Sequence, residues 1–320
     1  MTSVACRSHR RSFRGGNVFW EEWAPHAGHA HERQRPAVLV HGLADTSRTW
    51  NKIAPALARD RRLYALDLPG HGQSSRYDAS YDVSWYASLV VEWIRSLGLS
   101  DFDLIGHSLG GGIAMHVLLE QPGRVHRLAL VAAGGLGLEV AAPLRLASST
   151  GLLDLAAPVL MGLGTNAGVR VLGGNFDEAE RRHLVEMNGR PGSARALFRT
   201  LRNAVDLRGQ REHLLDHAHR LRELPPLAVY WGDRDPVIPV KHAETVHHYV
   251  DGAIVRRFPN VGHYPHREAV PEILSELFRF LDEPQRAPRL RPGARPPRAP
   301  EDARPSLWRR LAGTRLAEVE

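Results

Sequence analysis

Apolar residues follow two alternating rhythms between residues 37 and 281. Short, mostly apolar runs predict strands at 37–40, 62–68, 102–105, 127–132, 227–231 and 254–258. Apolar residues at helical spacing predict helices over 82–97, 109–120, 240–249 and 271–281. Such alternation needs crossover connections, so we expect an α/β fold with a doubly wound, mostly parallel sheet. In that architecture a ligand binds at the carboxyl ends of the strands.

Residues 136–222 interrupt this rhythm. Their patterns are helical, over 178–187, 194–207 and 211–221, and no strand stands out. Because the segment follows the 127–132 strand, it enters at the end of the sheet where ligands bind. We therefore predict a helical lid inserted into a core made of 17–135 and 223–284.

The two ends of the chain differ from its middle. The formal net charge is +7, but the first 36 residues carry +3 and the last 36 carry +5, which leaves −1 for the rest. A basic groove for nucleic acid is therefore not expected. Residues 1–16 are expected to form a disordered basic terminus, and 285–320, rich in Arg and Pro, a disordered tail. Around Trp308 a plain extension is preferred over a short docking helix.

Composition also excludes several kinds of binding site and anchor. The single cysteine, Cys6, excludes a disulfide or a cysteine-based zinc site within one chain, and no apolar run is long enough for a membrane anchor. We therefore expect a cytoplasmic protein. His26, His29 and His31 have a spacing that could hold a metal, but they are interpreted as a solvated loop. The glycines at 110–112 are not followed by Lys-Ser/Thr, so a phosphate-binding loop is rejected and neither a metal nor a cofactor is expected.

A nucleophilic serine is predicted at the end of the 102–105 strand. Ser108 stands in Gly106-His107-Ser108-Leu109-Gly110, between that strand and a helix. A serine on such a sharp turn needs small flanking residues, and the two glycines meet that need. The helix directs its N-terminal amides and positive dipole end at negative charge developing beside Ser108. The five-residue motif is common by chance, but its strand, turn and helix context makes it specific.

With these features, residues 17–284 resemble the α/β-hydrolase family. The resemblance also includes His41-Gly42-Leu43-Ala44-Asp45 after the first predicted strand and Asp67-Leu68-Pro69-Gly70-His71-Gly72 after the second. It implies that the backbone amides of Leu43 and Leu109 form an oxyanion hole. It also implies a general base and an orienting acid, in the chain order Ser, Asp, His.

His263 matches the family's base, because it lies in Gly262-His263-Tyr264-Pro265 between the last strand and the last helix. His107, His41 and His71 are interpreted as hydrogen-bonded structural imidazoles. His266 is expected to face solvent.

The acid is Asp233 or Asp235, two carboxylates in Gly232-Asp233-Arg234-Asp235-Pro236. Charge chemistry alone does not choose between them. The family pattern selects Asp235, which leaves Asp233 a role in the loop or in pairing with an arginine.

Together these residues predict a serine hydrolase that cleaves a carboxylic ester or thioester through an acyl-enzyme intermediate. Aliphatic residues between Leu144 and Leu163 suit a small-molecule acyl substrate, although packing of the lid onto the sheet explains them equally well. Two alternatives remain open: a carbon-carbon bond hydrolase acting on a dicarbonyl substrate, and a non-catalytic ligand receptor. The oligomeric state is not predicted.

Overall fold

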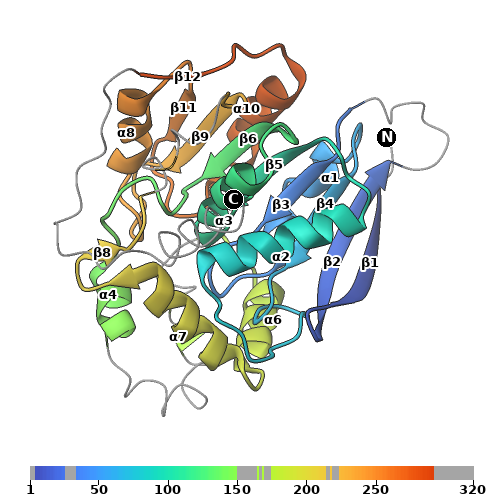
Figure 1. Ribbon diagram of the computed structural model, residues 1–320, viewed down its shortest axis with the longest axis vertical. Helices are drawn as coiled ribbons and strands as arrows, with labels where there is room; N and C mark the ends of the chain where they lie inside the picture. Colours follow the sequence, from blue (N-terminus) through green and yellow to red (C-terminus); the bar gives the residue numbers. More distant parts are fainter. Residues whose placement is uncertain are drawn as a thin grey trace, which may run out of the picture.

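An eight-stranded sheet in the order β1-β2-β4-β3-β5-β6-β9-β11 forms the centre of the protein (Figure 1). The computed structural model describes residues 4–25, 34–149, 164–165, 168, 174–213, 217 and 223–291. The strands of the sheet are β1 (Val4–Phe13), β2 (Gly16–Pro25), β3 (Ala37–Val40), β4 (Leu63–Asp67), β5 (Phe102–His107), β6 (Val125–Val131), β9 (Leu227–Gly232) and β11 (Ile254–Phe258). From β4 to β11 neighbouring strands run parallel, as predicted, whereas β2 pairs antiparallel with both β4 and β1.

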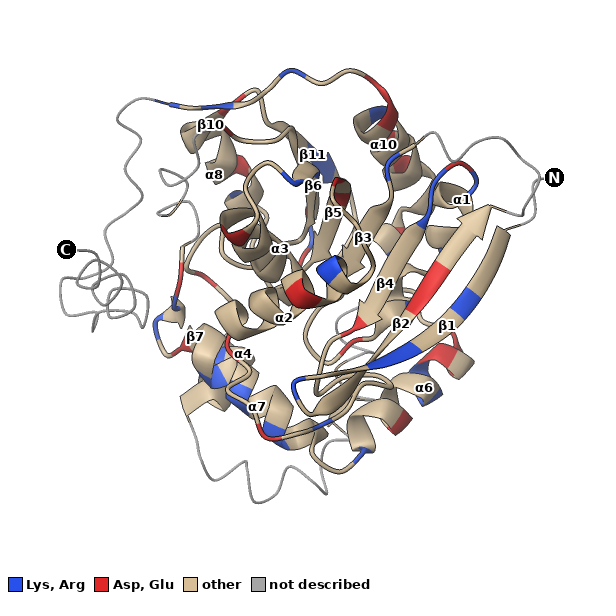
Figure 2. Cartoon of the chain, turned by 45° about the vertical axis from the view of Figure 1, so that its right-hand side comes forward, with Lys and Arg blue, Asp and Glu red and all other residues tan. Residues whose placement is uncertain are grey.

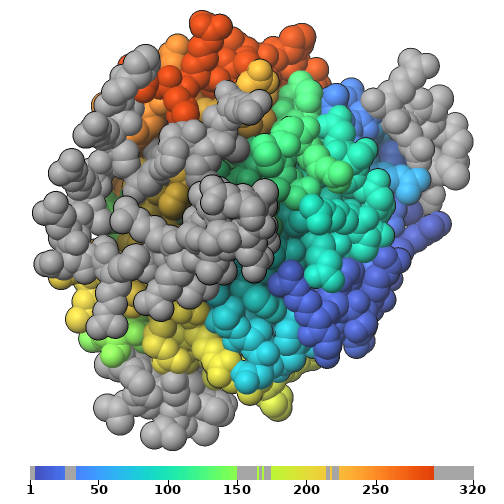
Figure 3. Space-filling view, viewed as in Figure 1, coloured from blue at the N-terminus to red at the C-terminus, as the bar shows by residue number. Residues whose placement is uncertain are grey.

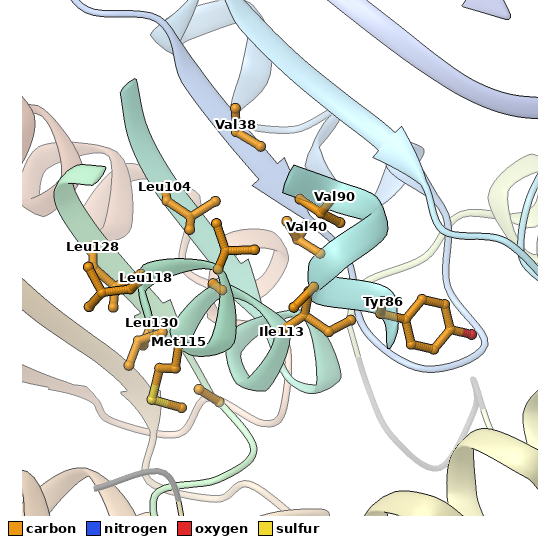
Figure 4. Packing of buried hydrophobic residues seen from close by; sticks show 14 of the residues in the cluster. Val38, Val40, Tyr86, Val90, Leu104, Ile113, Met115, Leu118, Leu128 and Leu130 are labelled. Carbon is orange, nitrogen blue, oxygen red and sulfur yellow. The ribbon is translucent and has the colours of Figure 1, made fainter. Parts of the chain in front are cut away.

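Helices cover both faces of this sheet. One face carries α2 (Val83–Ser96), α3 (Leu109–Glu120) and α8 (Lys241–Tyr249), and the other carries α1 (Ala54–Leu57) and α10 (Val270–Asp282). These bounds confirm the helices expected over 82–97, 109–120, 240–249 and 271–281. Figure 4 shows the packing on the first face, where Val38, Val40 and Leu104 of the sheet lie beside Ile113 and Val90 of the helices. Because both faces are covered, a central strand such as β3 is apolar throughout and fully buried.

The N-terminus differs from the prediction. Residues 4–13 form β1, which pairs with β2 along its whole length, so the prediction of a disordered terminus over 1–16 is wrong for the described residues 4–16. The basic residues of β1 contact the body of the protein: Arg10 lies over the ring of Phe19 at 6.0 Å, and His9 stacks on Trp20. In Figure 2, β1 carries basic residues beside the acidic residues of β2. Charged side chains on an edge strand discourage pairing with another chain. The basic residues of β1 are therefore compatible with its position at the edge of the sheet.

The described part of the segment between β6 and β9 is mostly helical. It contains α4 (Ala142–Ser149), α6 (Glu178–Gly189) and α7 (Ser193–Ala204), and a short hairpin of β7 (Val205–Asp206) and β8 (Gly209–Gln210). The hairpin is a strand pair that the sequence did not predict. Most of 211–221, and the aliphatic positions from Leu152 to Leu163, lie outside the described residues.

The helix α7 packs against the loop that leads into α2. Arg199 pairs with Asp78 and donates to the main-chain oxygen of Ala79 at 2.9 Å, and Asn203 donates to that of Ser80 at 2.8 Å. In Figure 3, α7 (yellow) and this loop (cyan) lie side by side on one surface. Side chains of the insertion are therefore anchored to the core by polar contacts with the backbone of the loop before α2.

Part of the predicted C-terminal tail is also ordered. Arg289–Leu290 form β12, which pairs with β10 (Val250–Asp251), so the disordered tail does not begin at 285. Trp308 lies outside the described residues, as do His26, His29 and His31. No helix in the described ranges is long and apolar enough to cross a membrane.

Candidate active site

Ser108 occupies a strained turn between β5 and α3. Its φ is 53° and its ψ is −119°, a conformation that non-glycine residues rarely adopt. The surrounding backbone holds it there: the Ser108 amide donates to the Val131 oxygen at 3.0 Å, and the Ser108 oxygen accepts from Gly111 and Gly134, each at 2.9 Å. The side chain is therefore presented at the carboxyl end of β5, beside the start of a helix.

Close backbone approach explains the glycines of this turn. A Cβ at Gly106 would lie 2.4 Å from the oxygen of Gly110, and a Cβ at Gly110 would lie 2.2 Å from the oxygen of Val40. Both distances are far below van der Waals contact, so side chains here would push α3 away from the sheet. The need for small residues beside Ser108, inferred from the sequence, has this physical basis.

The loop that follows β3 lies against the same turn. A Cβ on Gly42 would come within 3.1 Å of the Ser108 Cβ. This places Leu43, the next residue, on the β3 side of Ser108, while Leu109 follows Ser108 at the start of α3. The two residues that the family resemblance assigned to an oxyanion hole thus come from two segments that meet at Ser108.

His263 and Asp235 form a hydrogen-bonded pair. The Nδ1 atom of His263 donates to Asp235 Oδ2 at 2.8 Å, and both side chains are almost completely buried. Asp235 Oδ1 accepts from the amides of Val237 at 2.8 Å and Ile238 at 3.0 Å, which fixes the carboxylate in its loop after β9. With its proton on Nδ1, the imidazole keeps Nε2 as an acceptor. This is the arrangement that a general base requires.

The second carboxylate in that loop has a different partner. Asp233 Oδ1 accepts from the amide of Asn260 at 2.7 Å and so connects the loops after β9 and β11. Of the two residues that charge chemistry left open, Asp235 is the one that contacts His263.

The loop carrying His263 is joined to the serine turn. His107, which precedes Ser108, donates from Nε2 to the main-chain oxygen of His263 at 2.9 Å, and the two rings lie 4.9 Å apart. The structure thus brings the segments of Ser108, His263 and Asp235 together at the carboxyl ends of β5, β11 and β9.

The histidines interpreted as structural are buried and bonded. His41 Nδ1 donates to the Gly42 oxygen at 2.7 Å and its Nε2 accepts from the Leu68 amide at 3.0 Å. Burial lowers the pKa of His41 to about 4 and that of His71 to about 3, and it holds the pKa of His107 well below the ordinary range. All three are therefore neutral at pH 7.

The expectation that His266 faces solvent was wrong. The side chain is fully buried, its ring lies 4.6 Å from that of Trp50, and its Nε2 is 2.9 Å from the hydroxyl of Thr49. The short helix α9 (Pro265–Glu268) turns the chain directly after His263, and this turn directs His266 into the core. Burial holds its pKa well below the ordinary range.

The insertion reaches the loop after β3. Asn188, in the last turn of α6, donates from Nδ2 to the main-chain oxygen of Ala44 at 2.8 Å. A pocket of about 120 Å³ lies beside this contact, between loop residues such as Asp45 and Thr49 and residues of the α6 region such as Phe176 and His183. Burial raises the pKa of Asp45 to about 6.

Sequence reasoning missed Arg267 and Glu268. Both follow His263 closely, and both contact the chain just before α6. The motif around His263 identifies the histidine after the last strand, but nothing in that pattern marks a carboxylate five residues later as a partner of the histidine loop.

Comparisons with known proteins identify the family to which this fold belongs. A family model described as "Alpha/beta hydrolase family" matches residues 37–277. An uncharacterized protein of Mycobacterium tuberculosis is 35% identical over 77% of this chain and 75% of its own, and a 2-hydroxymuconate semialdehyde hydrolase of Pseudomonas putida is 29% identical over 78% and 87%. The crystal structure of an esterase from Rhodococcus sp. ECU1013 superposes with a TM-score of 0.64, at 24% identity, over 86% of this chain and 98% of the esterase.

Proposed function

Since the chain belongs to the alpha/beta hydrolase family, we propose that it hydrolyses a carboxylic ester or thioester of a small molecule with Ser108 as nucleophile. The observation that carries this proposal is the buried His263–Asp235 pair, which lies on loops that meet the strained turn at Ser108. Serine is a poor nucleophile at its own pKa and needs a base that can accept its proton; the proposal assigns this role to Nε2 of His263.

In the proposed reaction, His263 Nε2 removes the Ser108 hydroxyl proton as the oxygen attacks the substrate carbonyl. The amides of Leu43 and Leu109 hold the resulting oxyanion, and the positive end of the α3 dipole adds to this stabilisation. His263 then protonates the leaving alcohol or thiol, which leaves an acyl group on Ser108. A water molecule, activated by the same imidazole, releases the acid, and Asp235 stabilises the imidazolium in both halves. No step requires a cofactor.

The helices between β6 and β9 are proposed to cover this site. In support, α6 is bonded to the loop after β3 through Asn188, and Phe176 packs edge-on against Tyr264, next to His263, at 5.2 Å between ring centres. Both contacts join described parts of the insertion to the loops that carry Leu43 and His263, which supports the proposal. Such a cover would exclude water and bind the acyl chain.

A carbon-carbon bond hydrolase is the second candidate. The similarity to the 2-hydroxymuconate semialdehyde hydrolase, over most of both chains, favours it. The same serine, base and oxyanion hole can cleave a bond next to a carbonyl, so the residues described above serve either reaction.

One set of measurements tests these functions. A fluorophosphonate probe should label the wild-type protein at Ser108, and p-nitrophenyl acetate, butyrate, hexanoate and octanoate should be turned over. If the insertion forms an acyl pocket, each buried methylene should gain about 0.8 kcal/mol, or roughly fourfold in kcat/KM. If kcat/KM stays constant or falls as the acyl chain lengthens, and a vinylogous 1,5-dicarbonyl compound is cleaved, the second candidate is favoured. Absence of both labelling and turnover would exclude the two hydrolase functions and favour a non-catalytic ligand receptor.

A further inference from the structure

The carboxylate of Glu268 accepts hydrogen bonds from both residues that flank His263. Its Oε2 accepts from the amide of Gly262 at 2.9 Å, and its Oε1 accepts from the amide of Tyr264 at 3.1 Å. A single charged side chain thus holds the backbone on either side of the proposed base. Hydrogen bonds to an ionised acceptor are about twice as strong as neutral ones, so this is a firm attachment.

The local sequence allows the carboxylate to come this close. A Cβ at Gly262 would lie 3.1 Å and 3.2 Å from the two oxygens of Glu268, which is too tight for most side chains. Glu268 itself is the last residue of α9, whose first residue, Pro265, restricts the backbone at the start of the turn. The helix therefore returns the carboxylate to the loop from which it began.

The same carboxylate also holds the insertion. Glu268 Oε1 accepts from the amide of Gly174 at 3.2 Å, and its neighbour Arg267 donates from Nε to the Gly174 oxygen at 2.9 Å. Both main-chain groups of Gly174 are thus bound by consecutive residues of α9. The guanidinium of Arg267 is buried, lies 4.1 Å from the centre of the Phe176 ring, and donates to the oxygen of Thr49 at 3.1 Å.

We propose that Glu268 is a positioning residue, which sets the place of His263 through the amides of Gly262 and Tyr264 and couples it to the insertion through Gly174. This inference rests on the proposed function, because it takes His263 to be the base. A base must lie within hydrogen-bond reach of the proton that it removes, and a displacement of about 1 Å can cost roughly 10²-fold in rate. Glu268 itself is not assigned any contact with substrate.

The test uses Glu268→Gln in the full-length chain. Glutamine keeps the size of the side chain but places an NH₂ group against at least one of the three amides, so that contact is lost. We expect kcat for p-nitrophenyl butyrate to fall roughly 10²-fold while KM stays within about twofold, because substrate binding does not involve Glu268. The rate of fluorophosphonate labelling should fall with kcat.

The matched control is Glu272→Gln, the same chemical change on an exposed carboxylate in the first turn of α10. It should leave kcat and labelling unchanged. Amide hydrogen exchange at Gly262, Tyr264 and Gly174 gives a readout that does not depend on turnover. At one or more of these amides it should be faster in Glu268→Gln than in the wild type and the control.

Each outcome decides a separate point. Wild-type kcat in Glu268→Gln, with faster exchange at one or more of the three amides, would overturn the positioning role and leave the proposed function standing. Unchanged exchange would show that the carboxylate does not hold the loop. A wild-type protein that neither turns over esters nor reacts with the probe would overturn the proposed function, and the exchange data would still decide whether Glu268 fixes the His263 loop.

If Glu268→Gln does not fold, Gly174→Ala tests the coupling from the other side. Gly174 has a φ of +89°, and a Cβ there would lie 2.4 Å from the Phe176 ring, so alanine must displace this backbone. A lower kcat with faster exchange at Tyr264 would support the coupling. An unchanged kcat, with fast exchange at Gly174 alone, would overturn it.

Discussion

The imidazole of His107 donates from Nε2 to the main-chain oxygen of His263 at 2.9 Å. This bond joins the residue before the proposed nucleophile to the proposed base itself. Because burial keeps His107 neutral, one ring nitrogen carries the proton that makes the bond. The distance between the serine turn and the histidine loop therefore depends on a side chain that takes no direct part in the reaction.

Replacing His107 by phenylalanine should reduce kcat by about 10²-fold, since an aromatic ring is kept but the hydrogen bond to His263 is lost. His107→Gln, whose amide can donate to the same oxygen, should lose much less. Steady-state kinetics with p-nitrophenyl butyrate, together with circular dichroism to check folding, distinguish the two. Equal losses in both variants would mean that the ring packing, rather than the hydrogen bond, holds the loop.

The two carboxylates after β9 should behave differently. Asp235→Asn should lower kcat by roughly 10⁴-fold, because an amide at this position favours the wrong imidazole tautomer. Asp233→Asn should change kcat far less, because Asp233 bonds to the Asn260 amide and not to His263. Steady-state kinetics of the two purified variants provide the check. A larger loss of kcat in Asp233→Asn than in Asp235→Asn would identify Asp233 as the acid.

Two glycines of α3 form a matched pair for stability. Gly110→Ala places a Cβ 2.2 Å from the Val40 oxygen and should cost about 3 kcal/mol in the free energy of unfolding or prevent folding. Gly112→Ala meets no atom closer than 3.6 Å and should stabilise the protein by about 0.5–1 kcal/mol, because alanine favours helix. Urea unfolding of both variants measures the difference. Similar effects of the two changes would contradict the close approach of α3 to β3.

Buried His71 should make stability depend on pH. Burial, and then the neighbouring His41, lowers the pKa of His71 from 6.5 to about 3. Between these two pH values the imidazole is protonated in the unfolded chain and neutral in the folded protein. Stability present above pH 6.5 is therefore lost as the pH falls toward 3, by about 1.4 kcal/mol per pH unit.

The matched comparison is His71→Leu, which cannot titrate at this position. Other buried groups contribute to both proteins and cancel in the difference. Relative to His71→Leu, the wild type should lose stability steadily between pH 6.5 and 4.5, as measured by urea unfolding. Parallel stability curves over this range would show that His71 is protonated in the folded state.

The central strands were predictable because burial on both faces requires continuous apolar runs, and the glycine spacing around Ser108 indicated the turn. β1 was not predictable in the same way. Its arginines are typical of a disordered basic segment. Their partners in the structure are the apolar ring of Phe19 and the main-chain oxygen of Ser96, and no charge pattern in the sequence marks either as a partner. Composition identifies charge but does not show what the charged side chain covers.

Some residues of the candidate site were also predictable from the sequence, and others were not. Ser108 and His263 are marked by local motifs, since each depends on the small or rigid residues beside it. The contacts of His266 and Glu268 depend on the direction in which α9 turns, which no spacing of residue types reveals. Sequence patterns thus identify residues that need particular neighbours in the chain, and they miss residues whose role comes from the backbone of a distant segment.

The insertion begins and ends on two strands that lie next to each other in the sheet. β6 pairs with β9 in parallel, from Leu128 opposite Leu227 to Val131 opposite Tyr230. Ser108 follows β5, which is held independently between β3 and β6. The connection from β6 to β9 is therefore expected to tolerate shortening, lengthening or exchange for that of a relative while the sheet keeps its register. Under the proposed function, changes in this connection are expected to alter which substrate is bound and to leave the reaction at Ser108 the same, provided that the new segment still supplies a backbone amide for Glu268.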